Sequence, residues 1–280
     1  MKLKKTLILI FILTITFTYC QEKYVEKYPN GNLKVDGFIV GKTLDSIYKN
    51  YYENGNIKTE GFYKNCDYKT NRTSIYTFLQ TCGRINTKDS INAGKSHGTW
   101  KNYYESGTLK SVFNYHCNFL QGNNYTYFEN GNIESIEFYN EGKLLTSIEY
   151  HNNGFIAKNS LYSYIYNKKE IRNLKTTREI EYYENGNLKI QREAIEKEKH
   201  VEIESLKEYY SNGFLKSETE LIDLDKNGIY REYYENGNIK YEGKFLNDKP
   251  IEKQYYYHEN GKQHKIEYWK KGKLINTEIK

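Results

Sequence analysis

The side chains that could catalyse a reaction or hold a metal are thinly spread along this sequence. Its histidines stand singly, at His97, His116, His151, His200, His258 and His264. His116 adjoins Cys117, but neighbouring residues of a strand point to opposite faces, so no thiol–imidazole pair is expected. His258 and His264 flank one turn and are offset by one position, which argues against a metal site. No nucleophile elbow, zincin helix, phosphate loop or dinucleotide fingerprint is present. We therefore expect a protein with no enzymatic activity, no cofactor and no catalytic or metal-ligating residues.

Disulfide formation is the next chemistry to consider, because the chain has four cysteines. Cys66 and Cys82 lie in one irregular segment, and an oxidising compartment would favour a disulfide between them. We predict that bond, with two free thiols as the alternative. Cys117 has no evident partner, and no pair has the Cys-x-x-Cys spacing of a zinc knuckle or a redox motif.

Residues 1–20 have the pattern of a secretory signal peptide. Lys2, Lys4 and Lys5 precede an uncharged apolar run at 6–17. A transmembrane helix needs roughly 20 apolar residues, so the run is short for a span, and a buried helix is the other alternative. Cleavage would release a chain that starts at Gln21. Alternatively, Cys20 is acylated as a lipoprotein anchor, although bulky Tyr19 stands where that signal has a small residue. We expect a periplasmic, outer-membrane-associated or secreted protein that contacts a membrane only if Cys20 is acylated.

Charge and composition narrow the possible partners and the kind of core. Without its first 20 residues the chain keeps 39 basic and 36 acidic residues, and Lys and Glu alternate along it. Nucleic acid is therefore not an expected partner, since that binding needs a clustered basic surface. Only 38% of residues are hydrophobic, whereas Tyr contributes 31 residues. Tyrosine rings suit a half-buried sheet, because the ring packs while the hydroxyl reaches water or a neighbour.

A short repeat organises the rest of the chain. The octet Tyr-Tyr-Glu-Asn-Gly-Asn-Ile-Lys at 51–58 recurs at 233–240, with variants between and beside these copies. The central glycines of the nine copies are Gly31, Gly55, Gly107, Gly131, Gly154, Gly186, Gly213, Gly237 and Gly261. We thus predict an array over 21–280 with a period near 24, interrupted by an insertion or degenerate repeat at 64–96. Segment 190–207 could form a short helix, but a variant repeat fits its length better.

Each copy of the repeat reads as a β-hairpin. Asn-Gly between aromatic and β-branched residues predicts a two-residue type I′ turn, in which Tyr52 faces Ile57 and Tyr51 faces Lys58. Side chains alternate between faces, so Tyr52, Ile57 and Thr59 should point inward. A lone hairpin is marginal in water, so the units must stack on one another. The expected fold is all-β, an elongated single-layer solenoid of stacked antiparallel β-hairpins.

The repeat also resembles a known family. Gly98-Thr-Trp100, Tyr103-Tyr104-Glu-Ser-Gly107 and Leu109-Lys110, with Tyr234-Glu-Asn-Gly237 and Lys240-Tyr-Glu-Gly243, look like the variant MORN repeat. The resemblance covers about residues 24–278. Bacterial proteins built from this repeat are often labelled antitoxin-like. The resemblance implies a β-hairpin solenoid that serves as an interaction surface.

Two sets of repeated side chains are candidates for that surface. The glutamates before the turn glycines, Glu53, Glu129, Glu184, Glu235 and Glu259, are best explained as solvated residues that keep the sheet soluble. The first aromatic residue of the core, at Tyr51, Tyr103, Tyr182 and Tyr233, should point outward and form a ladder, although cross-strand packing would explain it equally well. We expect these tyrosines to bind a protein partner, so that the chain acts as a protein–protein interaction scaffold. A cell-surface glycan is the alternative ligand.

Overall fold

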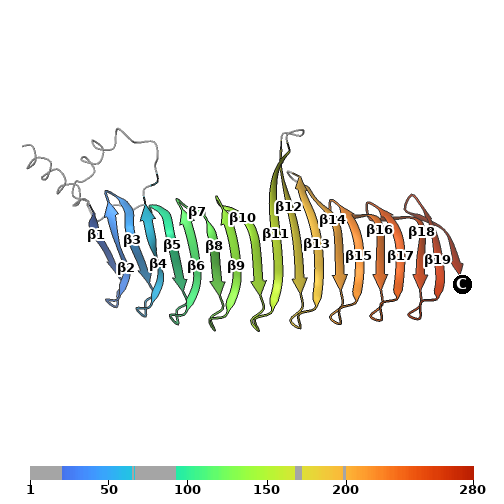
Figure 1. Ribbon diagram of the computed structural model, residues 1–280, viewed down its shortest axis with the longest axis horizontal. Coiled ribbons are helices and arrows are strands. Elements are labelled where there is room, and N and C mark those ends of the chain that lie inside the picture. The colour runs from blue at the N-terminus through green and yellow to red at the C-terminus, as the bar shows by residue number, and fades with distance from the viewer. Residues whose placement is uncertain (1–20, 65, 67–92, 168–171, 198–199) are drawn as a thin grey trace, which may run out of the picture. The chain divides into compact units, whose positions relative to one another are not determined.

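The computed structural model of the chain describes residues 21–64, 66, 93–167, 172–197 and 200–280. These ranges form strands and turns without any helix, so the prediction of an all-β fold of antiparallel hairpins is confirmed (Figure 1). A search of the same ranges for a helix with the length and apolarity of a membrane span finds none. The chain divides into two compact units, Met1–Ile133 with Phe138–Lys143, and Glu134–Glu137 with Leu144–Lys280.

The strands follow one another with short connections. The first ten are β1 (Glu22–Lys27), β2 (Leu33–Val40), β3 (Thr43–Tyr51), β4 (Ile57–Lys64), β5 (Lys95–Tyr103), β6 (Leu109–His116), β7 (Phe119–Leu120), β8 (Gly122–Tyr127), β9 (Ile133–Asn140) and β10 (Lys143–Tyr150). The next ten are β11 (Ile156–Asn167), β12 (Arg172–Tyr182), β13 (Leu188–Lys197), β14 (His200–Tyr209), β15 (Leu215–Ile222), β16 (Asp225–Tyr233), β17 (Ile239–Leu246), β18 (Lys249–Tyr257), β19 (Gln263–Lys270) and β20 (Lys273–Ile279).

Within each unit the strands pair antiparallel with their neighbours in sequence. In the first unit β1 to β6 pair successively, and β6 also pairs with β7 and β8. In the second unit each strand from β11 to β19 pairs with the next. Segment 190–207 belongs to β13 and β14, so it is a strand pair, as the variant-repeat interpretation predicted, and not a helix.

The Asn-Gly turn is longer than the sequence predicted. The Gly55 amide donates to the Tyr52 carbonyl at 3.0 Å, and the Tyr52 amide donates to the Asn56 carbonyl at 2.8 Å. The loop therefore has three residues, 53–55, in a type I turn that ends on a glycine with φ of 93°. The predicted type I′ turn is wrong, because this loop requires a positive φ only at the glycine. Gly accepts that conformation without strain, and the two residues before it keep an ordinary backbone.

The longer loop changes the pairing next to it and leaves the faces unchanged. Tyr51 pairs with Ile57, not with Lys58, and a bulge follows. Beyond the bulge Asn50 pairs with Thr59, as it would across a two-residue turn. All nine glycines of the predicted copies have φ between 81° and 93°, and the same two hydrogen bonds close all nine loops. We call the ends of the strands that these loops join the Asn-Gly side.

Type I′ geometry occurs at the other ends of the strands, which we call the opposite side. Two successive residues have positive φ in five of the described turns there, at 117–118, 141–142, 223–224, 247–248 and 271–272. The strands pair right up to these turns, as His116 does with Phe119 and Lys270 with Lys273. Positive φ at both central positions is the mark of a two-residue hairpin turn.

Tyrosine rings and small polar side chains form the core. In the first unit Trp100 is 7% exposed, and its ring centroid lies 4.7 Å from that of Tyr63 and 6.0 Å from that of Tyr48. The ring lies on Gly61, where an added Cβ would be 2.1 Å from it. In the second unit the Tyr241 ring lies 5.0 Å from Tyr256, beside Gln254, which is 1% exposed. Each unit thus has one face that carries its packed side chains, the core face.

Candidate functional site

The residues of the repeat core hold neighbouring loops together on the Asn-Gly side. The amides of Asn54 and Asn56 both donate to the carbonyl of Glu105 in the next loop, at 3.1 and 2.9 Å. The Tyr52 hydroxyl donates to the Tyr103 carbonyl at 2.9 Å. The same bonds recur in the second unit, where Asn236 and Asn238 donate to the Glu259 carbonyl and Tyr234 to the Tyr257 carbonyl. The most regular part of the sequence is therefore structural.

The glutamates of the loops point their carboxylates to solvent. Glu53, Glu129, Glu184, Glu235 and Glu259 are all exposed. Glu129 accepts a hydrogen bond from Ser106 at 3.0 Å. Each backbone carbonyl of Glu53, Glu184, Glu235 and Glu259 accepts a hydrogen bond from an asparagine side chain of the preceding loop. Their geometry agrees with the interpretation of solvated residues beside a turn.

The face opposite the core face carries rows of charged side chains, and we call it the ion-pair face. In the first unit the Glu60 carboxylate lies 3.5 Å from Lys49 and 3.7 Å from Lys101, and accepts a 2.8 Å hydrogen bond from the Tyr103 hydroxyl. That hydrogen bond is the largest cause of a lowered pKa at Glu60, and the two lysines add to it. Burial and the bond to Glu60 together raise the pKa of Tyr103 to about 12.

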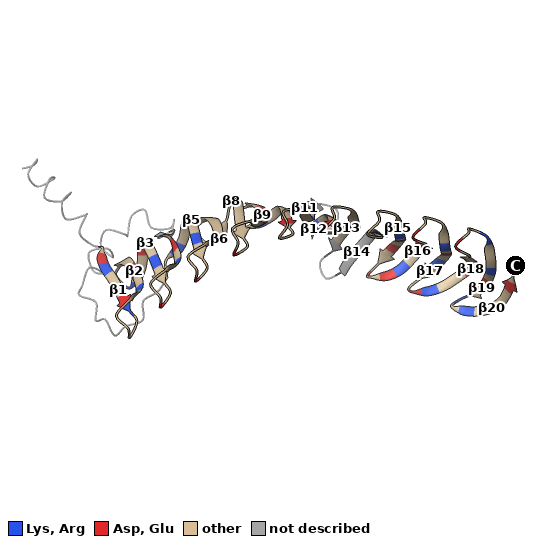
Figure 2. Cartoon of the chain, turned by 90° about the horizontal axis from the view of Figure 1, so that it is seen from below, with Lys and Arg blue, Asp and Glu red and all other residues tan. Residues whose placement is uncertain are grey.

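The second unit repeats this arrangement around an arginine. Arg231 bridges Glu218, at 2.9 Å, and Glu242. The Tyr233 hydroxyl donates to Glu218 at 2.9 Å, and burial and this bond raise the pKa of Tyr233 to about 12. Burial alone would raise the pKa of Glu218, but the bonds from Arg231 and Tyr233 hold it below its usual value. In each unit, basic and acidic residues alternate from strand to strand (Figure 2).

The four tyrosines predicted to bind a partner lie on this ion-pair face and are half-buried. Tyr103 and Tyr233 use their hydroxyls within the protein, as just described. Tyr51 follows Lys49 by two positions, and Tyr182 follows Arg178, which pairs with Glu193, by four. Alternation therefore places each tyrosine on the ion-pair face of its own unit. The tyrosines that the sequence predicted to point outward are therefore half-buried, and two of them have hydroxyls bonded within the protein.

Exposed apolar side chains accompany the charges on the ion-pair face, and the sequence interpretation missed them. Ile47 and Phe62 pair across β3 and β4 and are 54% and 37% exposed. In the second unit Leu161 and Ile229 are 49% and 44% exposed. Because side chains alternate between the two faces of a strand, the positions of the buried residues were sufficient to assign these apolar residues to the ion-pair face. Their exposure follows from the predicted single layer, but the sequence interpretation considered only the tyrosines and glutamates as surface candidates.

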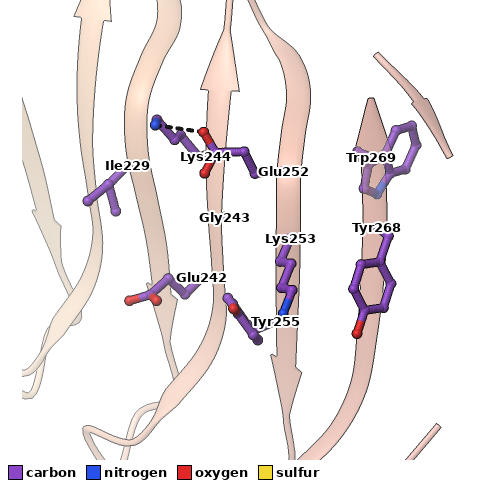
Figure 3. A pocket seen from close by; sticks show the side chains of 9 residues that line it. All are labelled: Ile229, Glu242, Gly243, Lys244, Glu252, Lys253, Tyr255, Tyr268 and Trp269. Carbon is purple, nitrogen blue, oxygen red and sulfur yellow. Dashed lines mark hydrogen bonds and ion pairs between the residues drawn. The ribbon is translucent and has the colours of Figure 1, made fainter. Parts of the chain in front are cut away.

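A shallow hollow of about 640 Å³ lies on the second unit, over β16 to β19 (Figure 3). Aromatic and charged residues line it: Ile229, Glu242, Gly243, Lys244, Glu252, Lys253, Tyr255, Tyr268 and Trp269. Lys244 and Glu252 form an ion pair at 2.8 Å on its wall, and the Lys253 ammonium lies 5.3 Å from the Tyr268 ring centroid. The arrangement combines flat rings with carboxylates and ammonium groups.

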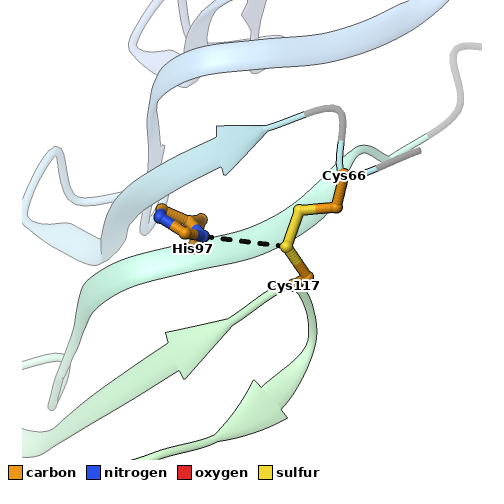
Figure 4. Close-up of side chains that lie close together, drawn as sticks. All are labelled: Cys66, His97 and Cys117. Carbon is orange, nitrogen blue, oxygen red and sulfur yellow. Dashed lines mark hydrogen bonds between the residues drawn. A yellow bond between two sulfur atoms is a disulfide. The ribbon is translucent and has the colours of Figure 1, made fainter. Parts of the chain in front are cut away.

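The predicted Cys66–Cys82 disulfide is wrong, because Cys66 is bonded to Cys117 (Figure 4). Cys66 follows β4, Cys117 begins the turn after β6, and the order β4, β5, β6 brings these ends together on the opposite side. Cys20 and Cys82 lie outside the described residues. The fate of Cys20 therefore stays a prediction.

A histidine of β5, the strand between β4 and β6, lies beside the Cys66–Cys117 disulfide. The His97 Nδ1 lies 3.9 Å from the Cys117 Sγ, and the rings of His97 and His116 are 5.2 Å apart. Burial lowers the pKa of His97, and Lys64 and His116 add to the effect. The sequence argument considered His116 with Cys117 and missed His97, which only the register of β5 against β6 brings near. A second histidine pair, His258 and His264, stacks with centroids 4.5 Å apart.

Comparison with known proteins finds a repeat similar to this one. The family described as MORN repeat variant matches five segments, residues 44–65, 96–116, 120–141, 175–193 and 226–247. No curated protein matches the chain. A solved structure titled "Crystal Structure of TcdB2-TccC3-TEV" aligns over 91% of this chain and 19% of that chain, at 10% identity and a TM-score of 0.16, which is too low to support any argument.

Proposed function

We propose that this chain, which is built from MORN repeats of the variant type, is an exported, non-enzymatic scaffold that binds another protein through its ion-pair face. The observation that carries the proposal is the exposure of Ile47 and Phe62, side by side on the face that bears Tyr51 and Tyr103. Apolar side chains ringed by tyrosines and charged residues resemble the centre and rim of a protein interface.

The charged rows fit the same role. Acidic residues of this face have basic partners within the sheet, as Glu60 has in Lys49 and Lys101 and Glu218 has in Arg231. A partner therefore need not supply a full set of countercharges, and burial of the apolar residues would provide most of the binding free energy. Part-exposed ion pairs contribute little stability themselves and would add specificity.

Site-specific photo-crosslinking in the native cell tests the binding face. A photoreactive residue at Ile47 should give a discrete crosslink to a second protein, whereas the same residue at exposed Glu53 in the neighbouring loop should not. The chain with Phe62→Glu should lose the crosslink from Ile47 while it keeps its far-UV circular dichroism. Equal crosslinking from Ile47 and Glu53, or no crosslink from either, would refute binding through this face.

Export is a separate part of the proposal and rests on the residues before Gln21. The intact mass of the native protein tests it: a chain that begins at Gln21 means cleavage, and a diacylated or triacylated Cys20 means a lipid anchor. A mass that still includes residues 1–20 would contradict export by either route.

A glycan is a second candidate ligand, because the hollow on the second unit presents Tyr255, Tyr268 and Trp269 among carboxylates. Flat rings stack on sugars, and carboxylates accept hydrogen bonds from hydroxyl groups. The chain has two tryptophans, so Trp100→Phe leaves Trp269 as the sole tryptophan reporter. Saturable quenching by one glycan of a panel in that variant, lost with Trp269→Phe, would support the candidate. A flat response across the panel would exclude it.

A further inference from the structure

We propose that the Cys66–Cys117 disulfide is the oxidised form of a zinc site, in which the two thiolates and the His97 imidazole bind Zn²⁺ after reduction. This inference is independent of partner binding, since it concerns the strand ends on the opposite side of the first unit. Two cysteine sulfurs and a histidine nitrogen are donors that Zn²⁺ prefers.

The three donor atoms are already grouped. The Cys66 Sγ, the Cys117 Sγ and the His97 Nδ1 all lie within 4.8 Å of one another, and the Cys117 Sγ is 3.9 Å from the His97 Nδ1. A tetrahedral Zn²⁺ with bonds of about 2.3 Å to sulfur and about 2.0 Å to nitrogen separates such atoms by roughly 3.5 Å. Cleavage of the disulfide and small side-chain rotations would therefore be sufficient to form the site (Figure 4).

The backbone fixes two of the three donors independently of the disulfide, and the third, Cys66, lies two residues after the end of β4. His97 lies within β5, where it pairs with Phe62 of β4. The turn that carries Cys117 is attached to β5 by two further bonds, because the Asn118 amide donates to the Ser96 carbonyl at 2.9 Å and the Ser96 amide donates to the Asn118 side chain at 2.6 Å. Reduction removes neither contact, so His97 and Cys117 stay close in the reduced chain, and Cys66 stays attached to the end of β4.

The fourth ligand position also has a candidate. The His116 ring centroid lies 5.2 Å from that of His97. A site with His116 would be closed, with two sulfur and two nitrogen donors, and a site with water in that position would be open. Both forms require His97.

The redox step is balanced by an external thiol or phosphine reductant. The reductant gives two electrons to the Cys66–Cys117 bond, and each sulfur takes one proton. A thiol reductant supplies the two protons and becomes its disulfide, whereas a phosphine takes an oxygen atom from water, which supplies the two protons, and becomes its oxide. Binding of Zn²⁺ then displaces one proton from each thiol. The cation and the disulfide exclude each other, because both use the same two sulfurs.

Titration of the full chain with Co²⁺ as a probe for Zn²⁺ tests the proposal. Cys20→Ser and Cys82→Ser are included so that Cys66 and Cys117 are the only thiols. After phosphine reduction we expect one Co²⁺ per chain, with the absorption of cobalt–thiolate charge transfer, and displacement by Zn²⁺. The oxidised chain should show no such band. His97→Ala should weaken binding about 10- to 100-fold, an effect of the size seen when groups around a metal site are removed.

His264→Ala is the matched control, because it alters the other histidine pair and should leave Co²⁺ affinity unchanged. Far-UV circular dichroism of the reduced chain without metal checks that the strands persist. The proposal is overturned if the reduced chain binds Co²⁺ no better than Cys66→Ser/Cys117→Ser, or if His97→Ala binds as tightly as the parent. Loss of the strands on reduction would overturn it as well, because the donors would then not be held together.

Discussion

The two ends of the hairpins differ in the hydrogen bonds that join neighbouring turns. On the Asn-Gly side, side chains of one loop bond to the backbone of the next, as Asn54 and Asn56 do to the Glu105 carbonyl. Among the described residues of the opposite side, bonds between neighbouring turns are fewer and less uniform, as where the Asp248 amide donates to the Lys226 carbonyl and the Lys226 amide donates to the Asp248 side chain. The connection between β4 and β5 departs from the repeat entirely. The same set of bonds recurs between Asn-Gly loops and requires a fixed loop length, whereas no such set recurs at every described turn of the opposite side.

This difference explains where the sequence varies. A change of length at an Asn-Gly loop would break bonds to two neighbours, so each loop keeps a length of three residues that ends on glycine. The opposite side tolerates an insertion and holds the Cys66–Cys117 bond. Variation in function should accordingly be sought on the opposite side and on the ion-pair face, while the Asn-Gly side keeps the repeats in register.

The largest expected effect comes from equal insertions on the two sides. Six Gly and Ser residues placed after Asn236 should destabilise the second unit by about 3 kcal/mol, since three hydrogen bonds of about 1 kcal/mol each are lost. The same insertion after Asp223 should cost only about 1 kcal/mol of loop entropy. Thermal melts followed by far-UV circular dichroism would compare them. Equal melting temperatures for the two variants would contradict the distinction between the sides.

Removal of the bonding side chains alone should have a somewhat smaller effect. Asn236→Ala with Asn238→Ala removes the bonds to the Glu259 carbonyl and keeps the loop length. We expect a loss of about 2 kcal/mol in the free energy of unfolding, measured by urea denaturation. Lys273→Ala, an exposed position on the opposite side, is the control and should change stability by less than about 0.5 kcal/mol. A loss no larger than that of the control would show that the bonds between loops are dispensable.

A backbone effect of opposite sign is expected on the opposite side. Leu224 has φ of 73° and is 65% exposed. A side chain in that region costs about 1–2 kcal/mol, whereas glycine there costs about 0.5–1 kcal/mol of extra chain entropy. Leu224→Gly should therefore stabilise the protein by about 0.5–1 kcal/mol in the same urea experiment. Gly272→Leu, with φ of 73° at the equivalent place, should destabilise it. If Leu224→Gly also destabilises, then contacts of the Leu224 side chain outweigh strain.

These comparisons also show which features the sequence could predict. The repeat located the nine glycines that end the Asn-Gly loops, all with positive φ. Its alternation assigned Tyr51 and Thr59 to opposite faces correctly. The predicted turn type was wrong, yet the predicted faces were right. The bulge beside Tyr51 compensates for the longer loop, so that Asn50 pairs with Thr59 as it would across a two-residue turn. Local pattern therefore predicted the hairpins and their two faces.

Contacts between separate hairpins could not be read from the same pattern. The Cys66–Cys117 bond and the short distance from His97 to Cys117 depend on how β4, β5 and β6 align. The sequence between β4 and β5 lacks the regular repeat from which that alignment could be predicted. The hollow near Trp269 likewise depends on side chains from four strands. Such sites depend on which side chains of neighbouring strands lie side by side, and a repeat of near-identical units does not specify this.

The smallest expected effect concerns the ion-pair face, and pH reveals it. The lowered pKa of Glu60 stabilises the fold above about pH 4.5, and this contribution is lost as pH falls through the folded-state pKa. The raised pKa of Tyr103 stabilises the fold below about pH 10, and this contribution is lost as pH rises from there towards about 12. Because both groups are partly exposed, Tyr103→Phe should cost only a few tenths of a kcal/mol at neutral pH.

Titration is therefore a sharper measurement of this contact than stability. In Tyr103→Phe the pKa of Glu60, followed by carboxyl NMR, should rise towards 4.5, because the hydrogen bond that lowers it most is gone. Tyrosinate absorbance should lose one group that titrates near pH 12. Tyr52→Phe is the matched control, since that hydroxyl bonds to a backbone carbonyl on the Asn-Gly side and should leave Glu60 unchanged. An unchanged Glu60 pKa in Tyr103→Phe would mean that Lys49 and Lys101 alone set it, and that Tyr103 is available to a partner after all.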